Sequence, residues 1–248
     1  MRILIALLIL LAAPVRAEEI VLGLSQDEVA ITATFEGSEI LIFGAIKRDS
    51  PVGEGALGVI VTVSGPELPV TVRRKDKRLG IWVNTDDVQI DSAPSFYAVA
   101  TSAPLEYVLR ATEDLTARIT LRSKIRTVGN NVMDSRNFSN ALVRIRTDQQ
   151  LYQTLEGSVD FEADTLFRTE IALPANLTEG DYQAKIYLTR DGSIVDTFET
   201  DIPVKKVGLE RWLYNLAHQN ALLYGLMSLA IAIASGWLAS AVFSIFRR

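Results

Sequence analysis

The longest uninterrupted apolar segment of the chain lies close to its C-terminal end. Residues 221–246 contain no charged side chain, and a helix needs about 20 apolar residues to cross the hydrocarbon core of a bilayer. Aromatic residues stand near both ends of this segment, as is usual at membrane interfaces: Trp212, Tyr214, Tyr224, Phe243 and Phe246. The pattern predicts a transmembrane helix over residues 221–246, an interfacial segment at 207–220 before it, and a short tail at 247–248.

A shorter apolar segment opens the chain at residues 3–13. At ~1.5 Å per helical residue it is too short to cross ~30 Å of hydrocarbon. The basic Arg2 before it, the helix-breaking Pro14 after it and a small residue, Ala17, at the expected cut are typical of a secretory signal peptide. We predict a signal peptide at residues 1–17, with an uncleaved anchor as the alternative. In this topology the folded part is exported and the C-terminus stays in the cytoplasm.

Between the two apolar segments, hydrophobic and polar positions alternate with the period of a β-strand. Strands are predicted at residues 29–36, 39–47, 57–64, 70–74, 79–83, 88–90 and 96–100. A hairpin turn is expected at residues 75–78. Many short strands with turn signals between them are typical of an immunoglobulin-like β-sandwich, which we assign to residues 18–104.

The hydrophobic period changes in the middle of the chain. Apolar residues at three- and four-residue spacing predict an amphipathic helix over residues 137–155. A weaker helical pattern covers residues 113–121. We interpret residues 105–157 as a helical connector.

Strand-like alternation returns after the connector, at residues 165–173 and 181–190. The dipeptide Asp191-Gly192 suits a type I′ hairpin turn into a last strand at 193–203. This region predicts a second, smaller β-sandwich at residues 158–206. The expected fold is therefore mainly β, with two immunoglobulin-like β-sandwich domains, a helical connector and one C-terminal transmembrane helix.

The charge of the exported part narrows the classes of partner. It contains all 30 acidic residues and 21 of the 25 basic residues, which gives a net charge of −9. A domain this acidic is a poor nucleic-acid binder, because phosphate neutralisation needs clustered lysine and arginine. The chain has no cysteine, so its stability must come from the burial of apolar side chains without disulfides.

Few residues suggest catalysis, a metal or a cofactor. The only histidine, His218, lies beside the predicted span, where it is either an interfacial polar residue or a pH sensor. Asn84, Asp86, Asp87 and Asp91 lack the spacing of a calcium loop. No nucleophile elbow or phosphate loop is present. We expect a protein that is not an enzyme and that binds no cofactor.

A basic cluster stands out on the otherwise acidic exported part. Its members are Arg73, Arg74, Lys75, Lys77 and Arg78, with Trp82 close by. Such a cluster suits anionic lipid, an acidic partner or an anionic solute, and its alternative is a solvated hairpin tip. Trp82 belongs either to this contact surface or to the core. We treat these six residues as a candidate partner surface.

Small residues recur at every fourth position of the predicted span: Ser228, Ala232, Gly236, Ser240 and Ser244. Small residues at this spacing let two helix backbones approach closely within a membrane. The pattern predicts a contact with a second transmembrane helix, either another copy of the chain or another membrane protein. A chance pattern in an alanine-rich span is the alternative.

Several short motifs are spread along the chain: Arg73-Arg74-Lys75, the stretch 80–84 (GIWVN), 94–100 (PSFYAVA), 165–168 (TLFR), Arg190-Asp191-Gly192, Leu223-Tyr224-Gly225 and 236–239 (GWLA). Together they resemble the motifs of the alphaproteobacterial putative transmembrane protein family. The resemblance covers essentially the whole mature chain. It implies a bacterial inner-membrane protein with a periplasmic domain, and an association with permeases of the sulfite-exporter type, but it supplies no catalytic residue.

Two functions fit these observations. In the first, the chain is an accessory subunit whose span contacts a polytopic permease and whose β-domains shape the periplasmic mouth of that permease. In the second, it is a membrane-tethered periplasmic binding or envelope-interaction module that acts through the basic hairpin. The lipid bilayer is a partner in both.

Overall fold

The computed structural model describes residues 18–26, 28–32, 35–48, 55–125, 135–207 and 209–246. The predicted signal peptide (1–17) and cytoplasmic tail (247–248) lie outside these residues. The chain divides into two compact units, one made of residues 1–29 and 36–204 and the other of residues 30–35 and 205–248. Each unit is described by itself.

A four-stranded antiparallel sheet joins the beginning of the chain to its second half. Its strands are β1 (Glu18–Leu24), β3 (Gly37–Arg48), β10 (Leu166–Pro174) and β9 (Asp160–Glu162), in the order β1-β3-β10-β9. Alternate residues of β10 are buried and exposed along most of its length, as the sequence pattern predicts. One face of this sheet therefore belongs to the core.

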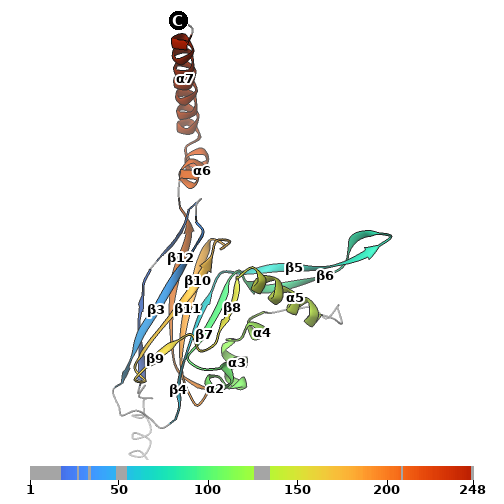
Figure 1. Ribbon diagram of the computed structural model, residues 1–248, viewed down its shortest axis with the longest axis vertical. Coiled ribbons are helices and arrows are strands. Elements are labelled where there is room, and N and C mark those ends of the chain that lie inside the picture. The colour runs from blue at the N-terminus through green and yellow to red at the C-terminus, as the bar shows by residue number, and fades with distance from the viewer. Residues whose placement is uncertain are drawn as a thin grey trace, which may run out of the picture. The chain divides into compact units, whose positions relative to one another are not determined.

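A six-stranded sheet forms the second layer (Figure 1). Its order is β2-β12-β11-β4-β7-β8, from strands β2 (Val29–Ile31), β12 (Ser193–Lys206), β11 (Gly180–Arg190), β4 (Leu57–Ser64), β7 (Tyr97–Thr101) and β8 (Tyr152–Leu155). The sheets are linked by contacts between β7 and β10 and by the Ile20 amide, which donates to the Asp196 carboxylate at 3.2 Å. Strands β4 and β7 are almost wholly buried, so they lie at the centre of the core.

The mainly β architecture is confirmed, but the division into two successive sandwiches is not seen. Strand β3 from the first predicted domain pairs with β10 from the second, and β4 pairs with β11 in the same way. Both sheets therefore draw on residues 18–104 and 158–206 together. The physical reason is that alternation fixes which face of a strand is buried, whereas the partner of that strand is set by contacts remote in sequence.

Strands β5 (Glu67–Arg78) and β6 (Ile81–Pro94) form a separate two-stranded ribbon (Figure 1). Its turn is Leu79-Gly80, and both residues have positive φ, 49° and 89°. The predicted turn at residues 75–78 is wrong, because these residues continue β5 and pair with β6. A hairpin is present, but its strands are much longer than the pattern indicated.

The described residues between β7 and β8 form four helices, so the expected helical connector is present. They are α2 (Leu105–Val108), α3 (Ala111–Ala117), α4 (Leu121–Lys124) and α5 (Ser135–Asp148). The predicted helix at 137–155 ends early because Gln150 has a φ of 60° and β8 follows. Tyr152 belongs to β8 and donates a hydrogen bond to the Pro94 carbonyl at 2.8 Å; burial raises its pKa to about 12.

The predicted turn at Asp191-Gly192 is confirmed. It connects β11 to β12, and both residues have positive φ, as a type I′ turn requires. The Asp191 carboxylate accepts a hydrogen bond from the Ala56 amide at 2.9 Å, which ties the turn to the segment before β4. This hydrogen bond therefore links the β11–β12 hairpin to the segment that leads into β4, the neighbour of β11 in the six-stranded sheet.

The second unit consists mainly of two helices, α6 (Leu209–Gln219) and α7 (Ala221–Phe246). Helix α7 has the limits that the apolar segment predicts. The side chains of residues 209–211, 215 and 243–246 lie outside the described part of the chain.

Candidate interaction surfaces

Helix α7 is long and apolar enough to cross a membrane over Ala221–Val242. None of that stretch is buried, and the helix lies near the C-terminal end, so it is neither a core helix of a soluble domain nor an N-terminal signal sequence. The side chains of α7 therefore require an apolar environment that the described part of the chain does not supply.

The small residues predicted as a helix contact are exposed on α7 at Ser228, Ala232, Gly236 and Ser240. Apart from the neighbouring backbone of α7, a Cβ atom added at Gly236 would meet no atom of the described residues within 4 Å. The Ser244 side chain lies outside the described residues. Within the described part, this stripe is open to a second helix, and a larger side chain there would disturb that contact without disturbing the fold of the chain.

Helix α6 has an apolar and a polar side, and its aromatic residues Trp212 and Tyr214 are more than half exposed. The His218 ring stacks on Tyr214 with 4.0 Å between ring centroids, and its Nδ1 lies 2.9 Å from the Tyr214 carbonyl oxygen. Among the described residues, no group of histidine, aspartate and glutamate side chains is arranged to hold a metal ion. His218 is thus engaged by a local aromatic contact.

The β5–β6 ribbon carries the basic cluster and an exposed apolar end. Leu79 is fully exposed, and Ile81 and Trp82 are 65% and 68% exposed. We call these three residues the apolar tip. The alternative that Trp82 belongs to the core is therefore wrong. The sequence analysis did not assign Leu79 and Ile81 to the candidate surface. The available signal was the glycine of Leu79-Gly80 between two alternating segments, which is typical of a hairpin turn.

The basic residues of the ribbon differ in how they are compensated. Arg74 lies 3.8 Å from the Asp86 carboxylate, and Arg78 lies 3.2 Å from Asp76. Within the described residues, Arg73, Lys75 and Lys77 form no ion pair. We call these three residues the basic row, because they occupy alternate positions of β5.

The base of the ribbon is fixed by helix α5. Val72 and Val88 of the ribbon pack with Phe138 and Leu142 of the helix in one apolar cluster. The Arg74 guanidinium lies over the Phe138 ring at 4.7 Å from its centroid. A groove of about 450 Å³ runs along this junction, and Arg73, Arg74 and Arg144 line it with no acidic residue.

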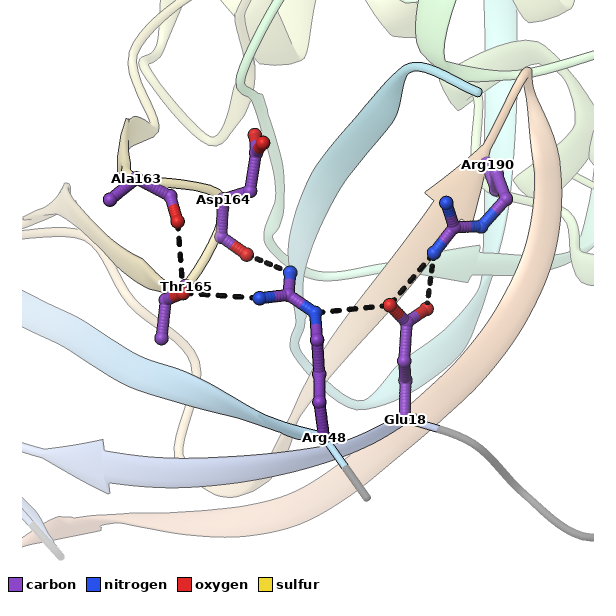
Figure 2. A network of polar contacts seen from close by, with 6 residues as sticks. All are labelled: Glu18, Arg48, Ala163, Asp164, Thr165 and Arg190. Carbon is purple, nitrogen blue, oxygen red and sulfur yellow. Dashed lines mark hydrogen bonds and ion pairs between the residues drawn. The ribbon is translucent and has the colours of Figure 1, made fainter. Parts of the chain in front are cut away.

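A second arginine cluster lies at the start of β1, where two arginines are paired with Glu18 (Figure 2). The Glu18 carboxylate accepts hydrogen bonds from Arg190 Nη2 at 2.7 and 2.8 Å and from Arg48 Nε at 3.1 Å. We call these three residues the Glu18 cluster. Arg48 also donates to the Thr165 hydroxyl and to the Asp164 carbonyl. The cluster therefore joins β1, β3 and β11 to the turn before β10.

The Glu18 cluster is mostly shielded from solvent. The side chains of Glu18, Arg48 and Arg190 are 11%, 13% and 17% exposed. Burial alone would raise the pKa of Glu18, but the hydrogen bonds from Arg190 and Arg48 outweigh it and hold the pKa below its usual range. The carboxylate is thus ionised and committed to the two guanidinium groups, which is a structural role.

Comparison with known proteins places the whole described chain in one family. The model of the family described as "Putative transmembrane protein" (Alph_Pro_TM) matches residues 19–245. A search of curated proteins gives no match to the chain. The matched segment includes the β-rich unit, α6 and nearly all of α7. The chain is a member of the Alph_Pro_TM family of transmembrane proteins.

Proposed function

We propose that this protein is a non-enzymatic accessory subunit of a membrane permease. In this proposal α7 is a single span of the bacterial inner membrane, the β-rich unit is periplasmic and the C-terminus is cytoplasmic. The signal peptide at residues 1–17 sets this orientation. The observation that carries the proposal is the exposed stripe of small residues on an uncharged 26-residue helix.

The stripe favours a helical partner because lipid does not require it. A span that contacts only lipid gains nothing from small residues at every fourth position, whereas two helices that pack closely do. Within the described residues, nothing obstructs Gly236, and the other described residues of the stripe are exposed. A polytopic permease offers such a helix, and the periplasmic unit would then stand at its mouth.

The family resemblance suggests the sulfite-exporter type for this permease, which transports a small anion. We include this type in the proposal as its most specific form. The identity of a co-purified partner tests it directly.

The β5–β6 ribbon favours a second candidate function. Here the chain is a membrane-tethered periplasmic interaction module, with immunoglobulin-like recognition by its β-unit and contacts through the basic row and the apolar tip. The specific observation in its favour is the exposure of Trp82, because exposed tryptophan is enriched in contact surfaces.

Co-purification separates the two candidates. The tagged full-length chain is extracted from its native membrane in mild detergent, and the proteins that accompany it are identified by mass spectrometry. The test variant is Ala232→Leu with Gly236→Leu. The matched control is Ala230→Leu with Ala234→Leu, which adds similar bulk ~200° away around the helix. A stoichiometric permease lost only in the test variant supports the accessory subunit.

The opposite outcomes are equally clear. Recovery of the chain alone, or only with further copies of itself, would contradict the accessory role and favour the tethered module. A periplasmic partner that survives both double variants would do the same.

A further inference from the structure

The apolar tip places hydrophobic side chains where no described residue of the chain covers them. Leu79 is fully exposed and has a φ of 49°, in the left-handed region that leucine rarely adopts. Asparagine or glycine would suit this type I′ turn better. A leucine that is both exposed and in a strained backbone conformation indicates that its side chain has a use outside the fold.

Cations stand directly beside the apolar tip. In the register of the ribbon, Lys77 pairs with Trp82 and Arg78 pairs with Ile81. Paired residues of an antiparallel ribbon project from the same face, so Trp82 and Ile81 each have a cation next to them. Tryptophan beside lysine or arginine is the combination found where proteins enter the interface of a membrane.

The ribbon keeps a net positive charge near its tip after the ion pairs between its own residues are taken into account. Asp76 and Asp86 are compensated by Arg78 and Arg74. Within the described residues, the basic row forms no ion pair, and only Arg73 lies opposite an acidic residue, Asp87, in the register of the ribbon. Its three cations recur at ~7 Å along β5, since alternate residues of a strand are about that far apart. This row complements a surface of closely spaced anionic groups.

The ribbon also carries its tip away from the body of its own unit. The last apolar residue of β5 that packs against α5 is Val72. Leu79 lies seven positions after Val72, and at ~3.3 Å per position this distance along the strand is about 23 Å. The tip can therefore enter another phase without unpacking the core.

We infer that the β5–β6 ribbon is a lipid-docking device that binds the surface of an anionic bilayer. The apolar tip enters the interfacial layer, and the cations of the ribbon lie against the phosphates of the head groups. Lipid suits this surface better than an acidic protein, because the apolar residues occupy the outermost point and the cations flank them. The contact does not depend on a partner for α7.

Tethering makes a weak contact sufficient. If α7 spans a membrane, as the proposed function holds, the ribbon is kept at a high effective concentration near a bilayer. Three apolar side chains and a few cations then suffice for reversible docking, because no free protein has to be captured from solution.

The fluorescence of Trp82 tests this inference in the full-length chain. Trp212→Phe and Trp237→Phe leave Trp82 as the only tryptophan. This protein is reconstituted into vesicles of phosphatidylcholine, with or without phosphatidylglycerol. Emission wavelength and quenching by brominated lipid are measured, and iodide reports exposure to water. Light scattering shows whether docking joins two vesicles or stays on one.

We expect the emission of Trp82 to shift to the blue and to be quenched by brominated lipid only when phosphatidylglycerol is present. Leu79→Ser should abolish the shift, and Lys75→Gln with Lys77→Gln should weaken it severalfold. The matched controls are Leu115→Ser, an exposed leucine on α3, and Lys47→Gln, an exposed lysine on β3, which should have no effect. Circular dichroism checks that each variant is folded.

Two results would overturn the inference. One is equal access of iodide to Trp82 in both kinds of vesicle. The other is protection of Trp82 only when a second protein is present, which would assign the ribbon to a protein partner. The Ala232→Leu/Gly236→Leu variant should keep the lipid signal, so failure of the proposed function and failure of this inference are distinguishable.

Discussion

The Glu18 cluster and the β5–β6 ribbon use basic side chains in opposite ways. In the Glu18 cluster two guanidinium groups converge on one carboxylate and are mostly shielded from water. On the ribbon, the basic residues diverge along an exposed strand, and part of them have no ion pair among the described residues. Basic side chains therefore hold strands together in one place and offer charge to the surroundings in the other. Burial and convergence decide which role applies.

The largest expected difference between the two regions comes from removing the shared carboxylate. Glu18→Ala leaves two shielded guanidinium groups without their acceptor, which should lower the free energy of unfolding by about 3 kcal/mol. Glu19→Ala is the matched control, because Glu19 is 69% exposed and lies 3.6 Å from Lys47; it should cost less than ~0.5 kcal/mol. Urea unfolding followed by β-sheet circular dichroism measures both. Equal losses of the free energy of unfolding in the two variants would show that the shielded cluster contributes no more than an exposed ion pair.

Acid should reproduce part of that loss. The pKa of Glu18 is lower in the folded chain than in the unfolded chain, where it is near 4.5, so the folded state binds fewer protons. The stabilisation by Glu18 is complete above pH 4.5 and is lost as the pH falls through the lowered value. The midpoint temperature of thermal unfolding should fall less steeply with decreasing pH for Glu18→Gln than for the native chain. Parallel curves would show that the carboxylate does not contribute.

The base of the ribbon should respond to truncation more strongly than its tip. Val72→Ala removes two methyl groups from the cluster with Phe138 and Leu142, which should cost about 1.5 kcal/mol. Ile81→Ala removes a larger but exposed group and should change the free energy of unfolding by less than ~0.5 kcal/mol. Hydrogen exchange of the ribbon amides compares the two variants. A larger effect at the tip would mean that the tip packs against part of the fold.

The smallest expected effect has the opposite sign. Leu79→Asn should stabilise the chain by roughly 0.5 to 1 kcal/mol, because asparagine tolerates the left-handed conformation of this turn. The same change removes the outermost apolar side chain and should abolish lipid docking. Thermal unfolding and the Trp82 assay on one variant test both expectations. A loss of stability would show that Leu79 is not strained.

The sequence pattern predicts local features of this molecule well. The limits of α7 and the turn at Asp191-Gly192 follow from local signals, an uncharged apolar segment and a glycine-containing dipeptide. The predicted turn at residues 75–78 failed because a run of charged residues resembles a turn in composition, whereas here it belongs to an exposed ribbon with no apolar face to mark it. The short strand β8 was missed because Tyr152 and Leu155 also fit a helical spacing.

Pairing between remote strands lies beyond what local patterns can supply. Leu166 pairs with Ala45, and Gln183 pairs with Ser64, so each sheet joins segments more than a hundred residues apart. The Glu18 cluster depends on the same pairing, since Arg48 and Arg190 approach Glu18 only after β1, β3 and β11 are in place. The basic cluster, in contrast, is contiguous in sequence and was predicted correctly as a charged region of one hairpin.

The interleaved pairing of β3 with β10 and of β4 with β11 bears on how the chain is made. Because the chain is synthesised from the N-terminus, neither sheet can be completed until the residues of β10 to β12 have been made. For most of its synthesis it therefore carries unpaired strand edges and few stable tertiary contacts. In the proposed topology, a chain that closes so late would stay extended enough to pass through a narrow export channel. It would then fold only after the last strand has crossed, immediately before the apolar helix stops in the membrane.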